Sequence, residues 1–125
     1  MQTSVIYKIL TRDEWRAFAA AGRTDGAPVD LADGFIHFSA ADQVAETAAK
    51  HFAGQNDLVL VAVDPAALGD GLTWEPSRGG ALFPHLYAPL DLSAVAWLTG
   101  MPLGPAGHVL PDPLPGAGAA PPDGA

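Results

Sequence analysis

The sequence predicts an α+β domain in which helices pack against a mixed or antiparallel sheet. Strand and helix patterns alternate over the first half of the chain, and only strand patterns follow in the second half. With 125 residues, of which 49% are hydrophobic, the chain has the size and apolar content of one domain. This order of elements argues against a parallel doubly wound fold.

The first strand and helix are expected at the start of the chain. Residues 5–10 form a short β-branched and aromatic run, which predicts a strand. At Thr11 the sequence Thr-Arg-Asp-Glu matches a capping box, so a helix should begin there. Trp15 and Phe18 fall on one face of this helix, and Gly22 is placed to end it in a left-handed conformation.

A second strand and helix are predicted after a loop. Residues 24–34 are rich in Asp, Gly and Pro, which is typical of a loop. A strand is predicted over residues 35–38 and a helix over about 40–53, with Ser39 as its cap and Gly54 just after it. The sequence therefore predicts two helices that pack on the sheet.

The later strands differ in their predicted burial. Residues 58–63 are an uninterrupted apolar run rich in valine, which predicts a central strand buried on both faces. Three shorter strands are predicted at residues 73–75, 83–87 and 94–98, separated by turns that contain Gly and Pro.

The C-terminal segment has a different composition. From Pro111 onward the chain is rich in Pro, Gly and Ala and has almost nothing to bury. We therefore expect one globular domain over residues 1–113 and a flexible tail over residues 114–125.

The composition excludes several classes of function. Fourteen acidic residues against six basic ones give a net charge of -8, and the basic residues are scattered, so no nucleic-acid partner is expected. The absence of cysteine excludes disulfides and thiolate chemistry. No stretch approaches the roughly 20 apolar residues that span a bilayer, and no signal peptide is seen. We expect a soluble, cytoplasmic protein without a membrane partner.

The segment GFIHFS, residues 34–39, holds the first candidate site residues. In a strand, Phe35 and His37 point to the same face. A lone imidazole in an apolar strand is often a core histidine bonded to a backbone carbonyl, and Ser39 could serve only as a helix cap. We retain both residues as candidates for ligand binding.

The segment WEPSRGGALFPHLY, residues 74–87, is the densest collection of functional side chains. Glu75 could act as a general base or hold a ribose hydroxyl, and burial beside Trp74 would raise its pKa. The alternative is a solvated acid at the end of a strand. Ser77 and Arg78 precede two glycines in a turn that could bind a phosphate or carboxylate, or could merely connect strands.

The end of this segment places three more rings on one strand face. Phe83, His85 and Tyr87 alternate with other residues, and Pro84 predicts an edge strand or a bend. Two strand histidines, a tyrosine, a glutamate and an arginine are more than core packing requires, so the sequence predicts a ligand pocket.

Other chemistry has less support in the sequence. His51 and His108 receive no role, and no H-E-x-x-H spacing is present, so we predict no metal site. The fingerprints of Walker loops, G-x-G-x-x-G loops and G-x-S-x-G elbows are absent as well.

The motifs DGFIH-x-S, WE and FPHLY, in this order, resemble the bacterial domain of unknown function 952 family. The resemblance extends over nearly the whole chain, up to about Pro113. It names no reaction, but the family is similar at fold level to the ADP-ribosyltransferase superfamily, in which NAD lies in a cleft of a split β-sheet. The resemblance thus implies a split sheet of that type and makes NAD the implied ligand or cofactor.

The superfamily resemblance also implies roles for individual residues. His37 would hold a ribose, Trp74 or Tyr87 would stack on nicotinamide, and Glu75 would steady the ribosyl cation. Fold kinship alone does not establish an activity. The predicted catalytic residues are Glu75 and His85, and the predicted ligand-binding residues are His37, Ser39, Trp74, Ser77, Arg78 and Tyr87.

We therefore expect a protein that binds NAD or a related ribonucleotide and acts on the glycosidic bond of its ribose. Two alternatives remain open at this point. One is a non-catalytic small-molecule sensor that uses the same pocket, and the other is an interaction domain that binds no ligand.

Overall fold

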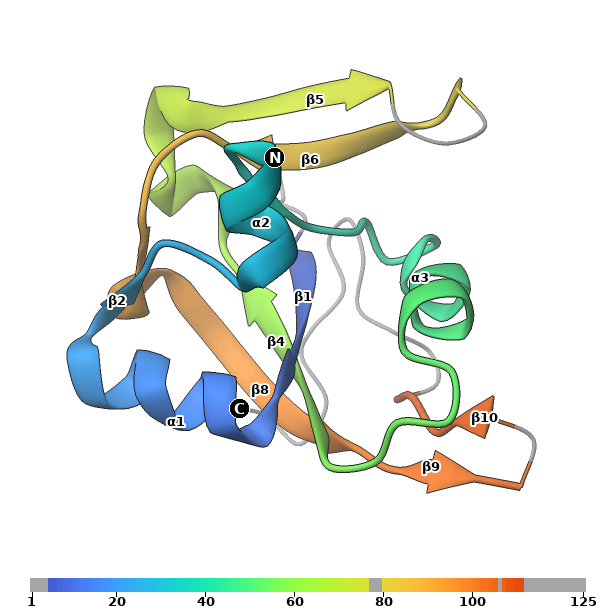
Figure 1. The fold of residues 1–125 in the computed structure, drawn as a ribbon. Coiled ribbons are helices and arrows are strands. Elements are labelled where there is room, and N and C mark those ends of the chain that lie inside the picture. The colour runs from blue at the N-terminus through green and yellow to red at the C-terminus, as the bar shows by residue number, and fades with distance from the viewer. Residues whose placement is uncertain (1–4, 77–79, 106, 112–125) are drawn as a thin grey trace.

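Two three-stranded antiparallel sheets organise the fold. The computed structural model describes residues 5–76, 80–105 and 107–111. The first sheet has the order β1-β4-β8 and comprises β1 (Ile6–Thr11), β4 (Leu58–Val63) and β8 (Val95–Met101). The second has the order β3-β6-β5 and comprises β3 (Ile36–His37), β6 (Leu82–Leu86) and β5 (Leu72–Pro76). Figure 1 shows β5 and β6 of one sheet apart from β1, β4 and β8 of the other. The α+β class is confirmed, and all the strand pairs are antiparallel.

The two sheets are joined at one isolated bridge between Tyr7 and Ser39. Each of these residues donates its backbone N–H to the carbonyl of the other, at 2.8 Å in both directions. Tyr7 lies on β1, the edge strand of the first sheet, and Ser39 follows β3 of the second sheet. Within the described residues, this pair is the isolated β-bridge that links the edge of the first sheet to the end of β3.

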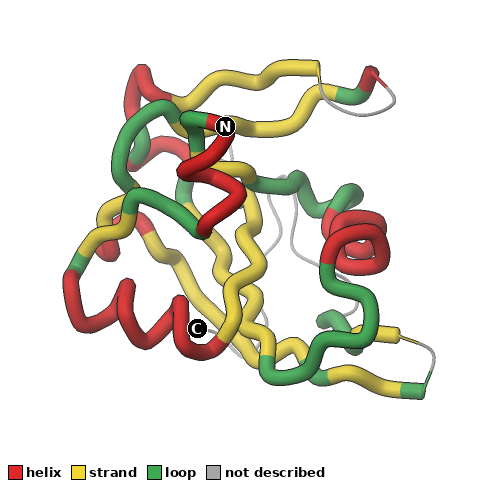
Figure 2. The backbone as a smooth tube through the Cα atoms, in the orientation of Figure 1, coloured by secondary structure: helices red, strands yellow, loops and turns green. Residues whose placement is uncertain are grey.

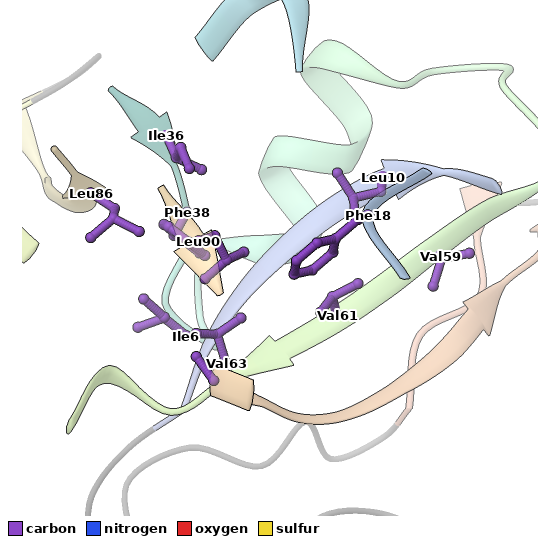
Figure 3. Packing of buried hydrophobic residues seen from close by; sticks show 11 residues of the cluster. Ile6, Leu10, Phe18, Ile36, Phe38, Val59, Val61, Val63, Leu86 and Leu90 are labelled. Atoms are coloured by element: carbon purple, nitrogen blue, oxygen red, sulfur yellow. The ribbon is translucent and has the colours of Figure 1, made fainter. Parts of the chain in front are cut away.

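The first sheet is covered on both faces. Helix α1 (Arg12–Ala21) adds Phe18 to a buried cluster that includes Leu10 and Val61, shown in Figure 3. Helix α3 (Val44–His51) packs Val44 against the opposite face, and the two helices lie on different sides of the sheet in Figure 2. All six residues of β4 are buried, so the prediction of a central strand buried on both faces is confirmed.

The start and the end of α1 follow the sequence prediction. Thr11 Oγ1 accepts a hydrogen bond from the backbone N–H of Glu14, and the Glu14 carboxylate accepts one from the N–H of Thr11. These two bonds are the capping box. Gly22 then ends the helix with a φ of 81°.

The prediction of a loop over residues 24–34 is wrong for half of that segment. Helix α2 (Pro28–Asp33) lies there, and the Asp30 carboxylate accepts a hydrogen bond from the N–H of Ala27 at 2.7 Å. Pro28 occupies the first position of this short helix and Gly34 follows its last position. Proline and glycine are also common in loops, so the two residues do not distinguish a short helix from a loop. The domain thus has three helices within the described residues, where two were predicted.

Helix α3 also begins later than predicted. Its N-cap is Gln43, and the side chain of Ser39 does not cap it. Ser39 Oγ instead lies 2.9 Å from the hydroxyl of Thr47, inside the helix. The turn formed by residues 40–43 separates the end of β3 from the helix.

The remaining elements are short. Strand β2 (Arg23–Thr24) pairs with β7 (Leu90–Asp91), and β9 (Leu103–Gly104) pairs with β10 (Gly107–His108). The described residues also include the 3-10 turns η1 (Pro65–Ala67), η2 (Gly69–Gly71) and η4 (Leu92–Ala94).

Two points of the sequence analysis concern the C-terminal tail and membrane-spanning helices. The predicted tail over residues 114–125 lies outside the described residues. Among the residues that the structure describes, no helix combines the length and the apolar character needed to cross a membrane.

Candidate functional site

A cluster of rings occupies one face of the second sheet. His37 and His85 are directly opposite each other on β3 and β6, with their ring centroids 5.6 Å apart. The ring of Phe35 stacks on His85 at 4.2 Å and contacts His37 at 4.6 Å and Tyr87 at 5.2 Å. The structure therefore brings together two histidines that are separated by almost fifty positions in the sequence.

This face lines a cavity of about 550 Å³, which is within the size range of small-molecule sites. The cavity extends from the second sheet past the edge of β1 to α2 and α3. Its wall includes His37, Ser39 and His85 among the residues predicted from the sequence. Further side chains on the wall are Lys8, Glu14, Asp30, Asp33, Thr47 and Phe83.

Glu75 holds the imidazole of His85 and the phenol of Tyr87. Its Oε1 atom lies 2.7 Å from His85 Nδ1 and accepts a hydrogen bond from the Tyr87 hydroxyl at 2.7 Å. These hydrogen bonds, that of Tyr87 first, lower the pKa of Glu75 below its ordinary value. The condition for a raised pKa, burial of both Glu75 and Trp74, is not met, because both side chains are partly exposed, and the neighbours of Glu75 donate to its carboxylate.

His37 is held between two carboxylates of α2. Its Nδ1 atom lies 2.6 Å from Asp30 Oδ1, and its Nε2 atom lies 2.9 Å from Asp33 Oδ2. The backbone N–H of His37 also donates to Asp30 Oδ1, at 3.1 Å. The ring is therefore fixed from both sides, which is a stronger restraint than the single backbone carbonyl of an ordinary core histidine.

A buried ion pair supports this arrangement. Lys8 Nζ lies 2.9 Å from Asp30 Oδ2 and also donates to the carbonyl of His37 at 3.0 Å. The side chain of Asp30 is fully buried and that of Lys8 is 7% exposed. Burial by itself would raise the pKa of Asp30, but the hydrogen bond with His37 and the charge of Lys8 outweigh it and lower the pKa to about 2.

Trp74 is one predicted site residue that the structure does not bring to the cavity. It is opposite Pro84 in the β5–β6 pair, so its side chain alternates with those of Thr73 and Glu75 and points to the other face of the sheet. Its side chain is 45% exposed and lies on the wall of neither cavity described for this protein. The stacking role that was considered for it has no geometric support.

The other predicted residues have separate outcomes. Tyr87 is half exposed and joins the ring cluster beside the cavity. Ser77 and Arg78 lie outside the described residues. Pro84 was predicted to mark an edge strand or a bend. The edge position is wrong, because β6 is the central strand of its sheet. The carbonyl of Pro84 accepts a hydrogen bond from the N–H of Phe38, just after β3.

Sequence reasoning missed the charged residues that orient His37. Lys8 is a single cation in an otherwise apolar strand, and such a residue needs a buried partner. Pro28 followed two positions later by Asp30 is a helix-start signal that also occurs in loops. These two signals together could have predicted a buried lysine–aspartate pair, although not its position beside His37.

A smaller cavity of about 260 Å³ adjoins the ring cluster. Phe35 and Tyr87 line it together with Asp25, Asp30, Leu31, Gly34, Ile36, Leu86, Ala88 and Pro89. Phe35 borders this cavity and contacts both histidines of the larger one. Among the described residues, no group of three His, Asp or Glu side chains is arranged to hold a metal ion.

The fold and this site define a small α+β protein with a histidine- and carboxylate-lined cavity beside the junction of two antiparallel sheets. The chain belongs to the DUF952 family of proteins of unknown function, whose model matches residues 9–98. No curated protein matches the chain.

Solved structures of one bacterial protein are similar to this chain. The X-ray crystal structure of protein CC0527 from Caulobacter crescentus is 57% identical, with a TM-score of 0.80, over 83% of this chain and 91% of that chain. The solution NMR structure of CC0527 has a TM-score of 0.75 at 57% identity, over 83% of this chain and 90% of that chain.

Proposed function

We propose that the larger cavity binds NAD or a related ribonucleotide and that the protein acts on the glycosidic bond of its ribose. The observation that carries this proposal is the pairing of His37 and His85 on one cavity wall, each held by a carboxylate. Paired imidazoles with oriented ring nitrogens suit both the recognition of ribose hydroxyls and proton transfer at a reacting sugar.

The proposed chemistry uses the ionised state of Glu75. Departure of the base from a ribose leaves positive charge on the anomeric carbon, and a carboxylate fixed nearby stabilises that charge. His85 and Tyr87 both bond to Oε1 of Glu75, whereas Oε2 makes no hydrogen bond to any described residue. Glu75 lies on the wall of neither cavity, so it would act from beside His85 and Tyr87, with Oε2 as the oxygen left for the ligand.

The arrangement of the sheets agrees with the superfamily resemblance on which this proposal also rests. An ADP-ribosyltransferase-like fold places NAD in a cleft of a split sheet, and here the Tyr7–Ser39 bridge links the two sheets beside the cavity. The smaller cavity, lined by Phe35 and Tyr87, would offer aromatic surface to a planar base. Asp30 lines both cavities, and in this proposal the smaller one would hold the base and the larger one the sugar of the same ligand.

Calorimetric titration of NAD, ADP-ribose and nicotinamide tests the binding step. We expect binding by the native protein and by Asp70→Ala, an exposed control on the wall of neither cavity, and at least tenfold weaker binding by His37→Ala and His85→Ala. Chromatographic detection of released nicotinamide tests turnover. The absence of heat with every nucleotide would remove the proposal.

A non-catalytic sensor is the second candidate function. It is favoured by the contacts of His37, because its two ring nitrogens already lie 2.6 and 2.9 Å from carboxylate oxygens of Asp30 and Asp33. A sensor would show binding of a nucleotide in the same titrations without release of any product. The third alternative, an interaction domain without a ligand, would show neither.

A further inference from the structure

The hydroxyl groups of Ser39 and Thr47 form a hydrogen-bond chain on the wall of the larger cavity. Both residues line that cavity. Ser39 Oγ lies 2.9 Å from Thr47 Oγ1, and Thr47 Oγ1 lies 3.0 Å from the backbone carbonyl oxygen of Gln43. Ser39 follows β3 and Thr47 belongs to α3, so the chain connects the second sheet to the helix that packs on the first.

The direction of this chain follows from the carbonyl at its end. A carbonyl only accepts hydrogen bonds, and a hydroxyl has a single proton to donate. Thr47 therefore gives its proton to the carbonyl of Gln43 and accepts the hydrogen bond from Ser39. The proton of Ser39 is thus used within the protein, and this order of donors and acceptors depends on no titratable group.

Ser39 Oγ is left as a hydrogen-bond acceptor on the cavity wall. A hydroxyl oxygen also has lone pairs that accept hydrogen bonds, and no described residue donates to Ser39 Oγ. The residue is 6% exposed, so few water molecules reach it. A ligand group that donates a hydrogen bond would satisfy this oxygen, whereas a ligand atom that only accepts would leave it without a partner.

The charged residues of the wall favour an uncharged part of a ligand beside Ser39. Lys8 is the one Lys or Arg among the described residues of the wall, and it pairs with the buried Asp30 at 2.9 Å. Glu14 and Asp33 add two further carboxylates to the wall. A phosphate would therefore meet no unpaired Lys or Arg among these residues, whereas the hydroxyl groups of a ribose can donate to Ser39.

We propose that Ser39 is a specificity-determining residue that accepts a hydrogen bond from a free ribose hydroxyl of the ligand. The larger cavity then takes the ribonucleoside part of a ligand in preference to forms in which that hydroxyl is absent or cannot donate. This inference rests on the proposed function, because it names the ligand group that the same cavity recognises. Ser39 lies two positions after His37, and both residues line the cavity.

The role of the ligand hydroxyl is tested with adenosine and nicotinamide riboside. These are the two ribonucleoside parts of NAD, and each has a single ribose. We expect at least one of them to bind in calorimetric titrations. Its 2′-deoxy or its 3′-deoxy form should bind about fivefold more weakly, because one hydrogen bond between neutral groups is lost. Binding of NAD without binding of either nucleoside would overturn the inference, and so would equal affinities for the nucleoside and both deoxy forms.

Ser39→Ala tests whether Ser39 is the residue that recognises the hydroxyl. The substitution should weaken binding of the nucleoside about fivefold and leave the affinity for the sensitive deoxy form unchanged. Ser93→Ala is the matched control, because Ser93 is exposed and lies on the wall of neither cavity. Circular dichroism verifies that both variants are folded. Equal weakening of the nucleoside and its deoxy form would indicate a packing role for Ser39 and would overturn the inference.

Thr47→Val tests the direction of the hydrogen-bond chain. Valine has nearly the shape of threonine but accepts no hydrogen bond, so Ser39 can turn its proton toward the ligand. The carbonyl of Gln43 also accepts a hydrogen bond from the backbone N–H of residue 47, at 3.0 Å. The substitution therefore leaves this carbonyl with a partner, and the variant is expected to fold.

The probe for Thr47→Val is the nucleoside with fluorine in place of the recognised hydroxyl. Fluorine is close to a hydroxyl in size but donates no hydrogen bond. We expect the native protein to bind this analogue about tenfold more weakly than the nucleoside. Thr47→Val should reduce the ratio to about threefold or less, because Ser39 no longer has to act as an acceptor. An unchanged ratio would overturn the direction assigned to the chain.

The outcomes distinguish this inference from the proposed function. Binding of NAD with no difference between the nucleosides and their deoxy forms would overturn the role of Ser39 and leave the proposed function intact. The absence of binding by NAD, ADP-ribose and both nucleosides would remove both. A loss of affinity in Ser39→Ala that is confined to the ligand with the hydroxyl would support both.

Discussion

At the residue scale, Asp30 is the side chain on which the site geometry depends. Its carboxylate binds Lys8, His37 and the N–H of Ala27 while it is fully buried. Removing one partner of a buried ion pair leaves the other charge uncompensated, at a cost of about 3 to 5 kcal/mol. We expect Asp30→Asn to lower the free energy of unfolding by about 3 kcal/mol in urea titrations.

Asp70→Asn is the matched control for this substitution. Asp70 is exposed, so the same chemical change there should alter stability by less than about 0.5 kcal/mol. Equal effects of the two substitutions would show that the Lys8–Asp30–His37 contacts contribute nothing to stability.

The lowered pKa of Asp30 also predicts how stability depends on pH. The pKa is about 2 in the folded protein against 3.8 ordinarily, so the folded state favours the ionised carboxylate. This contribution is complete above about pH 5 and is lost as the pH falls through 3.8 toward 2, with a total of about 2 kcal/mol. The difference in unfolding free energy between the native protein and Asp30→Asn should therefore shrink over that interval. A difference that stays constant down to pH 2 would contradict the assignment.

Tyr87 sets the ionisation of Glu75 more than any other group does. Its hydroxyl hydrogen bond is the largest cause of the lowered pKa of Glu75, ahead of that of His85. We expect Tyr87→Phe to raise the pKa of Glu75 toward its ordinary value, as measured by ¹³C NMR titration of the carboxyl carbon. An unchanged pKa would mean that the hydroxyl does not bond to Glu75 in solution.

At the element scale, α2 places both carboxylates that hold His37. The helix ends at Gly34, which has a φ of 87°, and a Cβ added there would meet no atom within 4 Å. Any cost of Gly34→Ala is therefore conformational, and we expect a loss of about 1 kcal/mol in unfolding free energy.

Gly100→Ala provides the control for this element. Gly100 lies in β8 with open space around an added Cβ, and its φ is outside the left-handed region. Alanine there should be neutral or should stabilise by a few tenths of a kcal/mol. Denaturant titrations of both variants make the comparison. A neutral Gly34→Ala would show that the end of α2 does not require the left-handed conformation.

At the scale of the whole molecule, the two sheets share one of the buried clusters. Leu86 of the second sheet and Val61 of the first belong to the same apolar cluster. Because burial in a common core couples the sheets, we expect one cooperative unfolding transition. Trp97 reports on the first sheet and Trp74 on the second.

Tryptophan fluorescence of Trp74→Phe and Trp97→Phe tests this coupling. Each variant retains one of the two sheet reporters together with Trp15 of α1. Its fluorescence transition should have the same midpoint as its own circular dichroism transition. Separated midpoints within one variant would indicate that the sheets unfold independently.

The prediction from sequence was most accurate where local signals were sufficient. The capping box of Thr11 and the apolar run of β4 determine their elements through short-range hydrogen bonds and burial on two faces, and both were predicted. Local signals did not predict α2, because proline, aspartate and glycine mark the ends of a short helix and are equally common in loops.

The sequence by itself determined the α+β class, the buried central strand and the candidate residues of the β3 and β6 strands. Only the tertiary structure decided which of these residues meet. Strand pairing sets His37 opposite His85, turns Trp74 to the other face and brings the cation of Lys8 to the carboxylate of Asp30. The physical reason is that register and buried charge pairing depend on contacts between distant segments, and no local pattern specifies the partner.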